Sequence, residues 1–467
     1  MVVNGRVQFN TFSGARRTGG GGGDDPPPPD DPPPPGEGTL AVRAEDFAKS
    51  IGVTMKPDDP AYPNGAAANA ALALGIGIRN VRFRYYYAER EWFGQLVDLL
   101  AAGGCRSLLV VSSIKKGLPE PGESEAPERV IPAIAANISA SSAPMVGLEG
   151  TNEPNHHNNC NPKTLISCWA PKCQALTRRT REALDASSAA WVRNLPYTTP
   201  TVALKRESDA QAMGIMVGSP RPWCTRGGIH LYAMGDEPEK RGYVEGWVNT
   251  QEEHNWPDNT PCDFSETGYF TALQSTESFP VSEDAQAIYE PRKFLHYWRV
   301  APAGSRIFTY GYVHLGTSLT NKQHRFGWIR NDGSFTPAYH AMKTFLAIFN
   351  DVGATFTPGR LRFAIAAGPT DLQPRVLFQR RRDGGYTFLL PLVRGVSVWQ
   401  KNAPPSLPRG RDLTPAAADV RVTFGPLVDV RVWSPSERTT PTAWRTGVTS
   451  HTEPVAGPMK ILEIRVP

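Results

Sequence analysis

Residues 106–150 contain RSLLVVS at 106–112, a helical stretch at 127–139 and PMVGLEG at 144–150. The first of these runs is almost continuously apolar, as are strands that are buried on both faces of a sheet. Two such runs joined by a helix predict a strand–helix–strand unit with parallel strands. The fold therefore depends on how often this unit recurs along the chain.

The same alternation extends in both directions. Strands are predicted at 50–55, 80–84, 106–112, 144–150, 214–219, 228–233, 261–265 and 305–312, and helices at 67–74, 91–102, 127–139, 172–190, 242–253, 282–300 and 336–350. Thr336 and Pro337 suit the cap and the first position of the last helix. Eight strands, most of them followed by a helix, over about 300 residues predict a (β/α)8 TIM barrel. The alternative, an open doubly wound sheet, would have a Gly-rich phosphate turn after the first strand, and this sequence has none there.

Beyond Asp351 the pattern changes to short alternating runs separated by Pro and Gly. These runs lie at 361–366, 375–379, 386–392, 396–400, 420–424, 428–433 and 460–466. Such a pattern is typical of antiparallel strands, and we expect a C-terminal β-sandwich. The predicted organisation is an α/β barrel over residues 45–352 and a β-sandwich domain over 353–467.

The segment from Gly19 to Gly38 has seven Gly, eight Pro and five acidic residues. Glycine runs are flexible and proline runs are extended, so we expect a disordered linker that could tether the barrel to another component. Residues 1–18 remain unassigned. The linker carries a charge of −5, so the formal net charge of +5 leaves +10 on the rest of the chain.

The basic residues are scattered except at Arg380–Arg382, which argues against a nucleic-acid-binding surface. The sequence contains no window of 18 apolar residues, so no membrane span is predicted. Residues 1–17 lack the basic-then-apolar order of a signal peptide. The six cysteines, Cys105, Cys160, Cys168, Cys173, Cys224 and Cys262, lie within 158 residues. Loop disulfides in a secreted or cell-surface protein are the expectation, with free thiols or a zinc site with His156 and His157 as alternatives.

Two glutamates follow predicted strands, and in a barrel chemistry takes place where the strands end. Glu153 follows the fourth strand in Asn152-Glu153-Pro154, and Glu266 ends the seventh in Ser265-Glu266-Thr267. Carboxyl groups that face each other across a cavity can flank a glycosidic bond, one protonating the leaving oxygen and the other attacking the anomeric carbon. Glu149 is a rival for the role on the fourth strand, although no asparagine precedes it.

At these residues the chain resembles clan A of the glycoside hydrolases, the retaining "4/7" barrels, and among them the xylosidase and iduronidase group. The resemblance implies Glu153 as acid/base and Glu266 as nucleophile, with Asn152 holding the sugar 2-hydroxyl. It also implies that Arg82 contacts the nucleophile, with Arg84 as the competing arginine on the same strand face. His230 and Tyr232, at the end of the sixth strand, would line the site.

Aromatic side chains after the strands suggest a carbohydrate cleft, because sugar faces stack on aromatic rings. Those expected to bind substrate are Trp223, Tyr310 and Trp328. We expect a retaining glycosidase that needs no cofactor or metal and acts on an oligosaccharide or polysaccharide. The competing hypotheses are a non-catalytic carbohydrate-binding or structural protein on the same barrel, and a metal-dependent barrel hydrolase.

Overall fold

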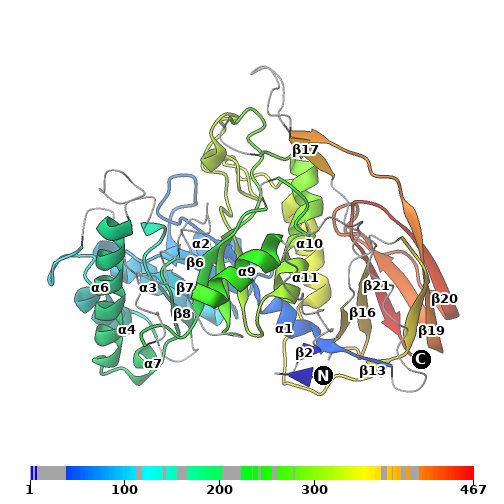
Figure 1. Ribbon diagram of the computed structural model, residues 1–467, viewed down its shortest axis with the longest axis horizontal. Helices are drawn as coiled ribbons and strands as arrows, with labels where there is room; N and C mark the ends of the chain where they lie inside the picture. Colours follow the sequence, from blue (N-terminus) through cyan, green and yellow to red (C-terminus); the bar gives the residue numbers. More distant parts are fainter. Residues whose placement is uncertain are drawn as a thin grey trace, which may run out of the picture.

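The computed structural model describes residues 2–3, 6–7, 38–111, 118–139, 144–154, 166–201, 222–233, 235–239, 243–254, 260–276, 279–369, 376–380, 382–390, 396–399 and 410–467. Its larger part is a ring of parallel strands surrounded by helices (Figure 1). The strands of the ring are β5 (Ile51–Thr54), β6 (Asn80–Arg84), β7 (Arg106–Val110), β8 (Met145–Glu149), β9 (Tyr197–Thr198), β10 (Gly227–His230), β11 (Cys262–Thr267) and β12 (Arg306–Thr309).

The strand order confirms the barrel. The eight-stranded sheet runs β10-β11-β12-β5-β6-β7-β8-β9, and every neighbouring pair is parallel. A parallel bridge between Thr198 and Arg226, the residue before β10, joins the two ends of this order. The side chains of Thr198 and Arg226 also share the carboxylate of Asp263, at 2.6 and 2.8 Å. The doubly wound alternative, an open sheet, is therefore excluded.

The helices pack around the ring, and their ends follow local sequence signals. Thr336 accepts a hydrogen bond from the backbone of Tyr339 and Pro337 is the first helical residue of the last helix, as predicted. Ser282 caps α10 in the same way. The helices of this part are α1 (Ala44–Ala48), α2 (Ala66–Leu74), α3 (Arg90–Ala102), α4 (Pro127–Asn137), α6 (Ile166–Asp185), α7 (Ala190–Arg193), α9 (Tyr243–His254), α10 (Glu283–Val300) and α11 (Pro337–Phe349), with short 3-10 turns η1 (Tyr87–Glu89) and η3 (Lys322–His324).

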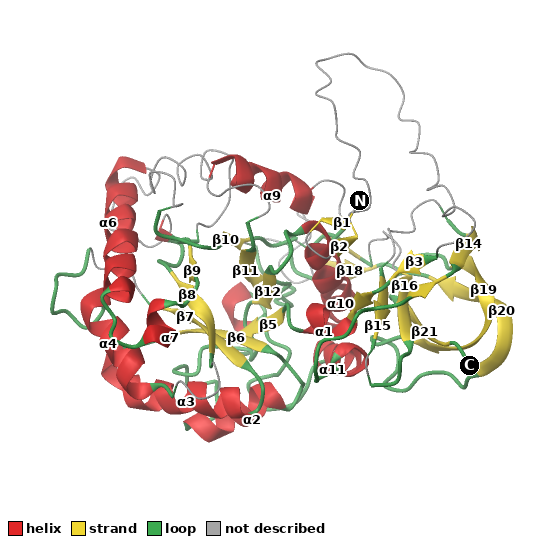
Figure 2. Cartoon of the chain, turned by 90° about the horizontal axis from the view of Figure 1, so that it is seen from below, coloured by secondary structure: helices red, strands yellow, loops and turns green. Residues whose placement is uncertain are grey.

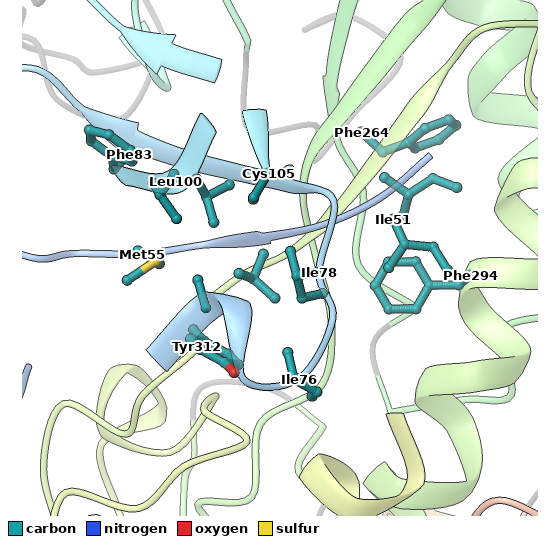
Figure 3. Packing of buried hydrophobic residues seen from close by; sticks show 14 of the residues in the cluster. Ile51, Met55, Ile76, Ile78, Phe83, Leu100, Cys105, Phe264, Phe294 and Tyr312 are labelled. Carbon is teal, nitrogen blue, oxygen red and sulfur yellow. The ribbon is translucent and has the colours of Figure 1, made fainter. Parts of the chain in front are cut away.

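The core of the barrel domain lies between the strands and these helices. Ile51 on β5 packs near Phe264 of β11 and Phe294 of α10 (Figure 3). All three side chains are completely buried, as residues of a close-packed interior are.

The fifth strand is a correction to the sequence prediction. The strand between β8 and β10 is Tyr197–Thr198, whereas the run predicted for this place, residues 214–219, lies outside the described residues. A strand of two residues has too few positions to show an alternating pattern, which is why the sequence hides it.

The second domain is antiparallel β structure, as expected. Its seven-stranded sheet has the order β14-β19-β21-β16-β15-β4, with β20 paired to β19, and it curves strongly (Figure 2). The long β19 joins two strands that the sequence analysis separates, and β20 was missed. The strands outside the barrel are β1 (Val2–Val3), β2 (Arg6–Val7), β3 (Thr39–Leu40), β4 (Val42–Arg43), β13 (Arg360–Leu361), β14 (Phe363–Ala367), β15 (Leu377–Gln379), β16 (Tyr386–Leu390), β17 (Ser397–Trp399), β18 (Gly410–Asp412), β19 (Ala418–Trp433), β20 (Arg445–Val455) and β21 (Lys460–Arg465).

The two domains share a continuous apolar interface. Phe47 of α1 stacks on Phe378 of the sheet at 5.2 Å between ring centroids and meets Trp298 of α10 edge-on at 5.3 Å. Strand β4, which precedes the barrel in sequence, pairs with β15 of the second domain. The chain thus contributes to the C-terminal sheet before it enters the barrel.

Among the described residues no disulfide is formed by the cysteines whose side chains are described, which are Cys105, Cys173, Cys224 and Cys262. The disulfide expectation finds no support among them, while Cys160 and the side chain of Cys168 lie outside the described part, as do His156, His157 and the predicted linker up to Glu37. No described helix is long and apolar enough to cross a membrane. Secretion stays a prediction.

Candidate active site

The structure brings the two predicted glutamates together at the carboxyl-terminal end of the barrel strands, called the mouth below. Glu153 lies four residues after the end of β8, and Glu266 lies within the last two residues of β11. One carboxylate oxygen of each lies within 4.8 Å of the other. Their side chains are 18% and 10% exposed, so both are accessible from the mouth while being largely shielded from water.

Glu266 is held by two donors. Arg82 Nη1 donates to Glu266 Oε1 at 2.8 Å, and the Tyr232 hydroxyl donates to Oε2 at 3.0 Å. Burial acts to lower the pKa of Arg82, but the carboxylates of Glu149 and Glu266 raise it above its usual value, so Arg82 is a permanent cation. Together the two donors fix the position of both carboxylate oxygens of Glu266.

Glu149, the rival on the fourth strand, occupies a different place. Its carboxylate is completely buried and receives two bonds from Arg82, at 2.6 and 2.8 Å. Thr201 and Ser265 donate to the same carboxylate, at 2.9 and 3.1 Å. Burial acts to raise the pKa of Glu149, yet the charge of Arg82 and the neighbouring donors lower it to about 2. Glu149 is thus the fixed counterion of Arg82 behind the site, and substrate cannot reach it.

Glu153 has the one positive backbone φ of a non-glycine residue in the described chain, +42°. Its N–H donates to the carbonyl of Thr201 at 2.7 Å, which holds the turn after β8 against the segment after β9. A positive φ is uncommon for residues with a Cβ and costs of order 1 kcal/mol. The surrounding contacts thus keep Glu153 in a strained conformation, in which its carboxyl group lies 3.0 Å from His230 Nδ1 and within 4.8 Å of Glu266.

His230, the last residue of β10, lies between the carboxylates. Its Nδ1 is 3.0 Å from Glu153 Oε1 and 3.6 Å from Glu266 Oε2, and its Nε2 is 3.9 Å from Glu149 Oε1. Burial acts to lower the pKa of His230, but attraction to the carboxylates of Glu266, Glu149 and Glu153 raises it to about 9. The imidazole is therefore protonated at neutral pH and shares its Nδ1 proton with Glu153.

The other predicted contacts at the mouth are present in part. Arg82 also donates to Asn152 Oδ1, which places this asparagine beside the arginine. Arg84, the competing arginine, points elsewhere, with its guanidinium on Glu125 at 2.7 Å and over the Tyr86 ring at 4.8 Å.

Tyr310 follows β12, and its hydroxyl donates to Gln323 at 2.8 Å. The ammonium of Lys56 lies 5.1 Å from the centroid of its ring. Burial raises the pKa of Tyr310 well above its usual value, and so do the charges of Glu266 and Glu153. Tyr310 therefore lies near both catalytic candidates, and its contact with substrate stays a prediction.

Two predicted sugar-binding residues are corrected by the structure. Trp223 lies four residues before β10, at the amino-terminal end of that strand and so at the opposite end of the barrel from the mouth. Its misplacement follows directly from the wrong fifth strand. Trp328 is completely buried and packs edge-on against Phe294 and Tyr312 in the barrel core, so no sugar can stack on it.

Sequence reasoning also missed the hydroxyl donors to Glu149. Thr201 follows the undetected β9, and nothing in the sequence marks it. Ser265 and Glu266 are adjacent on β11, and regular alternation would point them to opposite faces. The register shift between Phe264 and Thr267 lets both reach the site.

Glu153, His230 and Glu266 could also hold a divalent metal ion, since their ligand atoms all lie within 4.8 Å of one another. Two observations oppose this. A protonated imidazole cannot ligate a metal, and the raised pKa of His230 favours that form. The guanidinium of Arg82, 2.8 Å from Glu266, would also repel a cation.

No family model matches the sequence, and no curated protein matches it. Solved structures do match. A family 39 glycoside hydrolase from Bacteroides cellulosilyticus has a TM-score of 0.58 at 14% identity, with 91% of this chain and 82% of that chain covered. A glucosidase from Croceicoccus marinus has a TM-score of 0.57 at 13% identity, covering 92% of this chain and 100% of the other. At such identities the likeness concerns the fold alone, which is a (β/α)8 barrel with an added β domain.

Proposed function

We propose that this protein is a retaining glycoside hydrolase with Glu266 as nucleophile and Glu153 as acid/base. The observation that carries the proposal is the separation of the two carboxylates, whose nearest oxygens lie within 4.8 Å. Retaining glycosidases have carboxyl groups about 5–5.5 Å apart, whereas inverting enzymes need about 6.5–9.5 Å to admit a water molecule. The likeness in fold to glycoside hydrolases agrees with this reading.

In the first step Glu266 attacks the anomeric carbon and forms an ester bond to the sugar. The glycosidic C–O bond breaks, and Glu153 gives its proton to the departing oxygen. Glu266 suits the role of nucleophile because Arg82 and Tyr232 hold one oxygen each, which fixes the direction of the carboxylate.

In the second step a water molecule attacks the same carbon from the face that the leaving group has vacated. Glu153 accepts the proton of this water, and the ester bond to Glu266 breaks, so the product keeps the configuration of the substrate.

His230 supports both steps by sharing a proton with Glu153 across 3.0 Å. When Glu266 loses its charge in the ester, the strongest attraction that holds the proton on His230 disappears. Glu153 has to act as a base in the second step. At that stage the imidazole of His230 holds its proton less strongly, because the two groups titrate as a coupled pair. Asn152, whose oxygen is bound by Arg82, has its amide nitrogen left to donate to a sugar hydroxyl.

The test is a screen of aryl glycosides with the native protein, Glu266→Ala and Glu153→Ala, with Glu125→Ala as control. Glu125 is an exposed carboxylate near the mouth that pairs only with Arg84 among the described residues. We expect the control to retain full activity and Glu266→Ala to lose it. Hydrolysis that survives Glu266→Ala would refute the assignment of the nucleophile.

Two further measurements separate the alternatives. The first is NMR of the initial anomer, which should show retention, and inversion would refute the double displacement. The second is assay after dialysis against a chelator, which should leave the rate unchanged; loss that is restored by a divalent cation would favour the metal-dependent hydrolase instead. A protein that binds oligosaccharides and cleaves none would be the non-catalytic alternative.

A further inference from the structure

A hollow lies among the loops that follow β5 and β6 and the start of α3. It has a volume of about 670 Å³, within the usual range of small-molecule sites. Its walls come from the loops after β5 and β6 and from the first residues of α3, and they include Asp58, Asn64, Glu89, Arg90, Glu91 and Trp92. Because β5 and β6 are parallel barrel strands, these loops lie at the same end of the barrel as Glu153 and Glu266.

Described contacts connect this hollow to the catalytic centre. Lys56, next in sequence to Pro57 of the hollow wall, lies over the ring of Tyr310, which in turn lies near Glu266. A chain of contacts through Lys56 and Tyr310 thus runs from the wall of the hollow to Glu266.

The chemistry of the walls suits an uncharged ligand rich in hydroxyl groups. Trp92 is half-buried and packs against the core, with the ring of Phe93 edge-on at 4.8 Å between ring centroids. Asn64 and three carboxylates, Asp58, Glu89 and Glu91, are exposed and can accept hydrogen bonds from hydroxyls. Arg90 is engaged with Tyr87, donating to its carbonyl at 3.4 Å and lying 4.9 Å from its ring centroid.

The local charge of the hollow differs from that of the whole protein. The chain has a formal net charge of +5, which by itself would suit acidic glycans. Three carboxylates and one guanidinium line the hollow, so it would repel a uronic acid or a sulfated sugar. Local charge acts at contact distance, whereas charges farther away than about 10 Å are largely screened by salt.

We infer that this hollow is an additional sugar subsite, so that the substrate is a neutral oligosaccharide whose chain extends from the catalytic carboxylates over Trp92. The inference takes the place of bond cleavage from the proposed function, whereas the binding of sugar in the hollow does not depend on that function. It implies that affinity grows with chain length until the hollow is filled.

The test is calorimetric titration of full-length Glu266→Gln protein, which should bind without turnover, with cello-, xylo- and manno-oligosaccharides of two to six units. We expect at least one series to bind more tightly as its chain lengthens. Trp92→Ala in the same background should weaken binding of the longest member about threefold to tenfold and leave that of the shortest unchanged. Asn64→Ala, an exposed position whose loss disturbs no core packing, should act in the same direction.

Trp191→Ala is the matched control, because Trp191 is also a half-buried tryptophan but lies on α7. It should not change affinity. The inference would be overturned if affinity were equal at all chain lengths in the parent, the Trp92 variant and the Asn64 variant. It would also be overturned if no series bound at all. Tighter binding of oligouronides than of neutral chains would overturn its charge argument.

The two proposals fail separately. Binding that depends on Trp92 and chain length, without hydrolysis of any glycoside by native protein, would refute the proposed activity and leave the subsite standing. Hydrolysis by native protein, together with affinity that does not change in Trp92→Ala, would refute the subsite and leave the proposed activity standing.

Discussion

Arg82 is the cation that joins the buried Glu149 to the catalytic candidate Glu266, and Arg82→Met separates its structural role from its chemical one. Methionine fills much of the volume but leaves the carboxylate of Glu149 buried without its ion pair. Breaking a buried pair in this way costs about 3–5 kcal/mol of the free energy of unfolding. The pKa of Glu149 leads to a similar figure, since a shift from 4.5 to about 2 corresponds to about 3 kcal/mol.

The double variant Arg82→Met/Glu149→Gln tests the cause. Glutamine carries no charge and keeps an oxygen that can accept from Thr201 and Ser265, so we expect it to restore more than half of the lost stability. Activity should not return, because Glu266 still lacks its cation; the loss of one preorganised donor costs about 10²–10³ in kcat. Stability is measured by denaturant unfolding followed by circular dichroism, and activity on the glycoside found in the screen.

Acid titration provides an independent check. The pKa of Glu149 is lowered in the folded protein, so its contribution to stability is present above pH 4.5 and is lost as pH falls toward 2. Arg82→Met should lose less stability over this range than native protein. Arg84→Met is the control, because its pair with Glu125 is exposed and contributes at most about 1 kcal/mol. An Arg82→Met protein as stable as the control, or a double variant no more stable than the single one, would refute the reasoning.

Three further predictions concern the same barrel. The pKa of His230 is raised to about 9, so its contribution to stability is complete below pH 6.5 and disappears as the pH rises through 9. Denaturant titrations over this range should show that the free energy of unfolding falls by about 3 kcal/mol. This loss should be absent in His230→Asn. Asp263→Ala should lower the free energy of unfolding by about 3–5 kcal/mol in the same assay, because it leaves Arg226 and Arg306 without the carboxylate they share. A loss below about 1 kcal/mol would contradict the role of Asp263 in closing the ring. Glu153→Gly should raise the midpoint of thermal unfolding, because glycine adopts a φ of +42° without strain. The same substitution should abolish hydrolysis, because it removes the acid/base. An unchanged or lower midpoint would show that the turn is not strained.

The sequence was most informative where a strand is long enough to show its pattern. The predicted bounds of β6 agree with the structure, and α3 and α11 begin within one residue of their predicted starts. The pairing of Asn152-Glu153 with Glu266 after the fourth and seventh strands predicted two carboxyl groups at one end of the barrel. It did so because parallel strands that alternate with helices all end on the same side.

Other features could not be read from the chain because they depend on which segments meet in space. A two-residue strand has no pattern, and its loss placed Trp223 at the wrong end of the barrel. Trp328 looked like a mouth residue because it follows a strand, yet burial is decided by what packs over a loop. The sequence by itself determined the barrel, its antiparallel companion domain and the two facing glutamates, since periodicity and motif spacing are local properties. Only the tertiary structure decided that Glu149 neutralises Arg82 behind the site and that His230 holds its proton among three carboxylates, because charge and pKa depend on neighbours that are up to 81 residues apart in the chain.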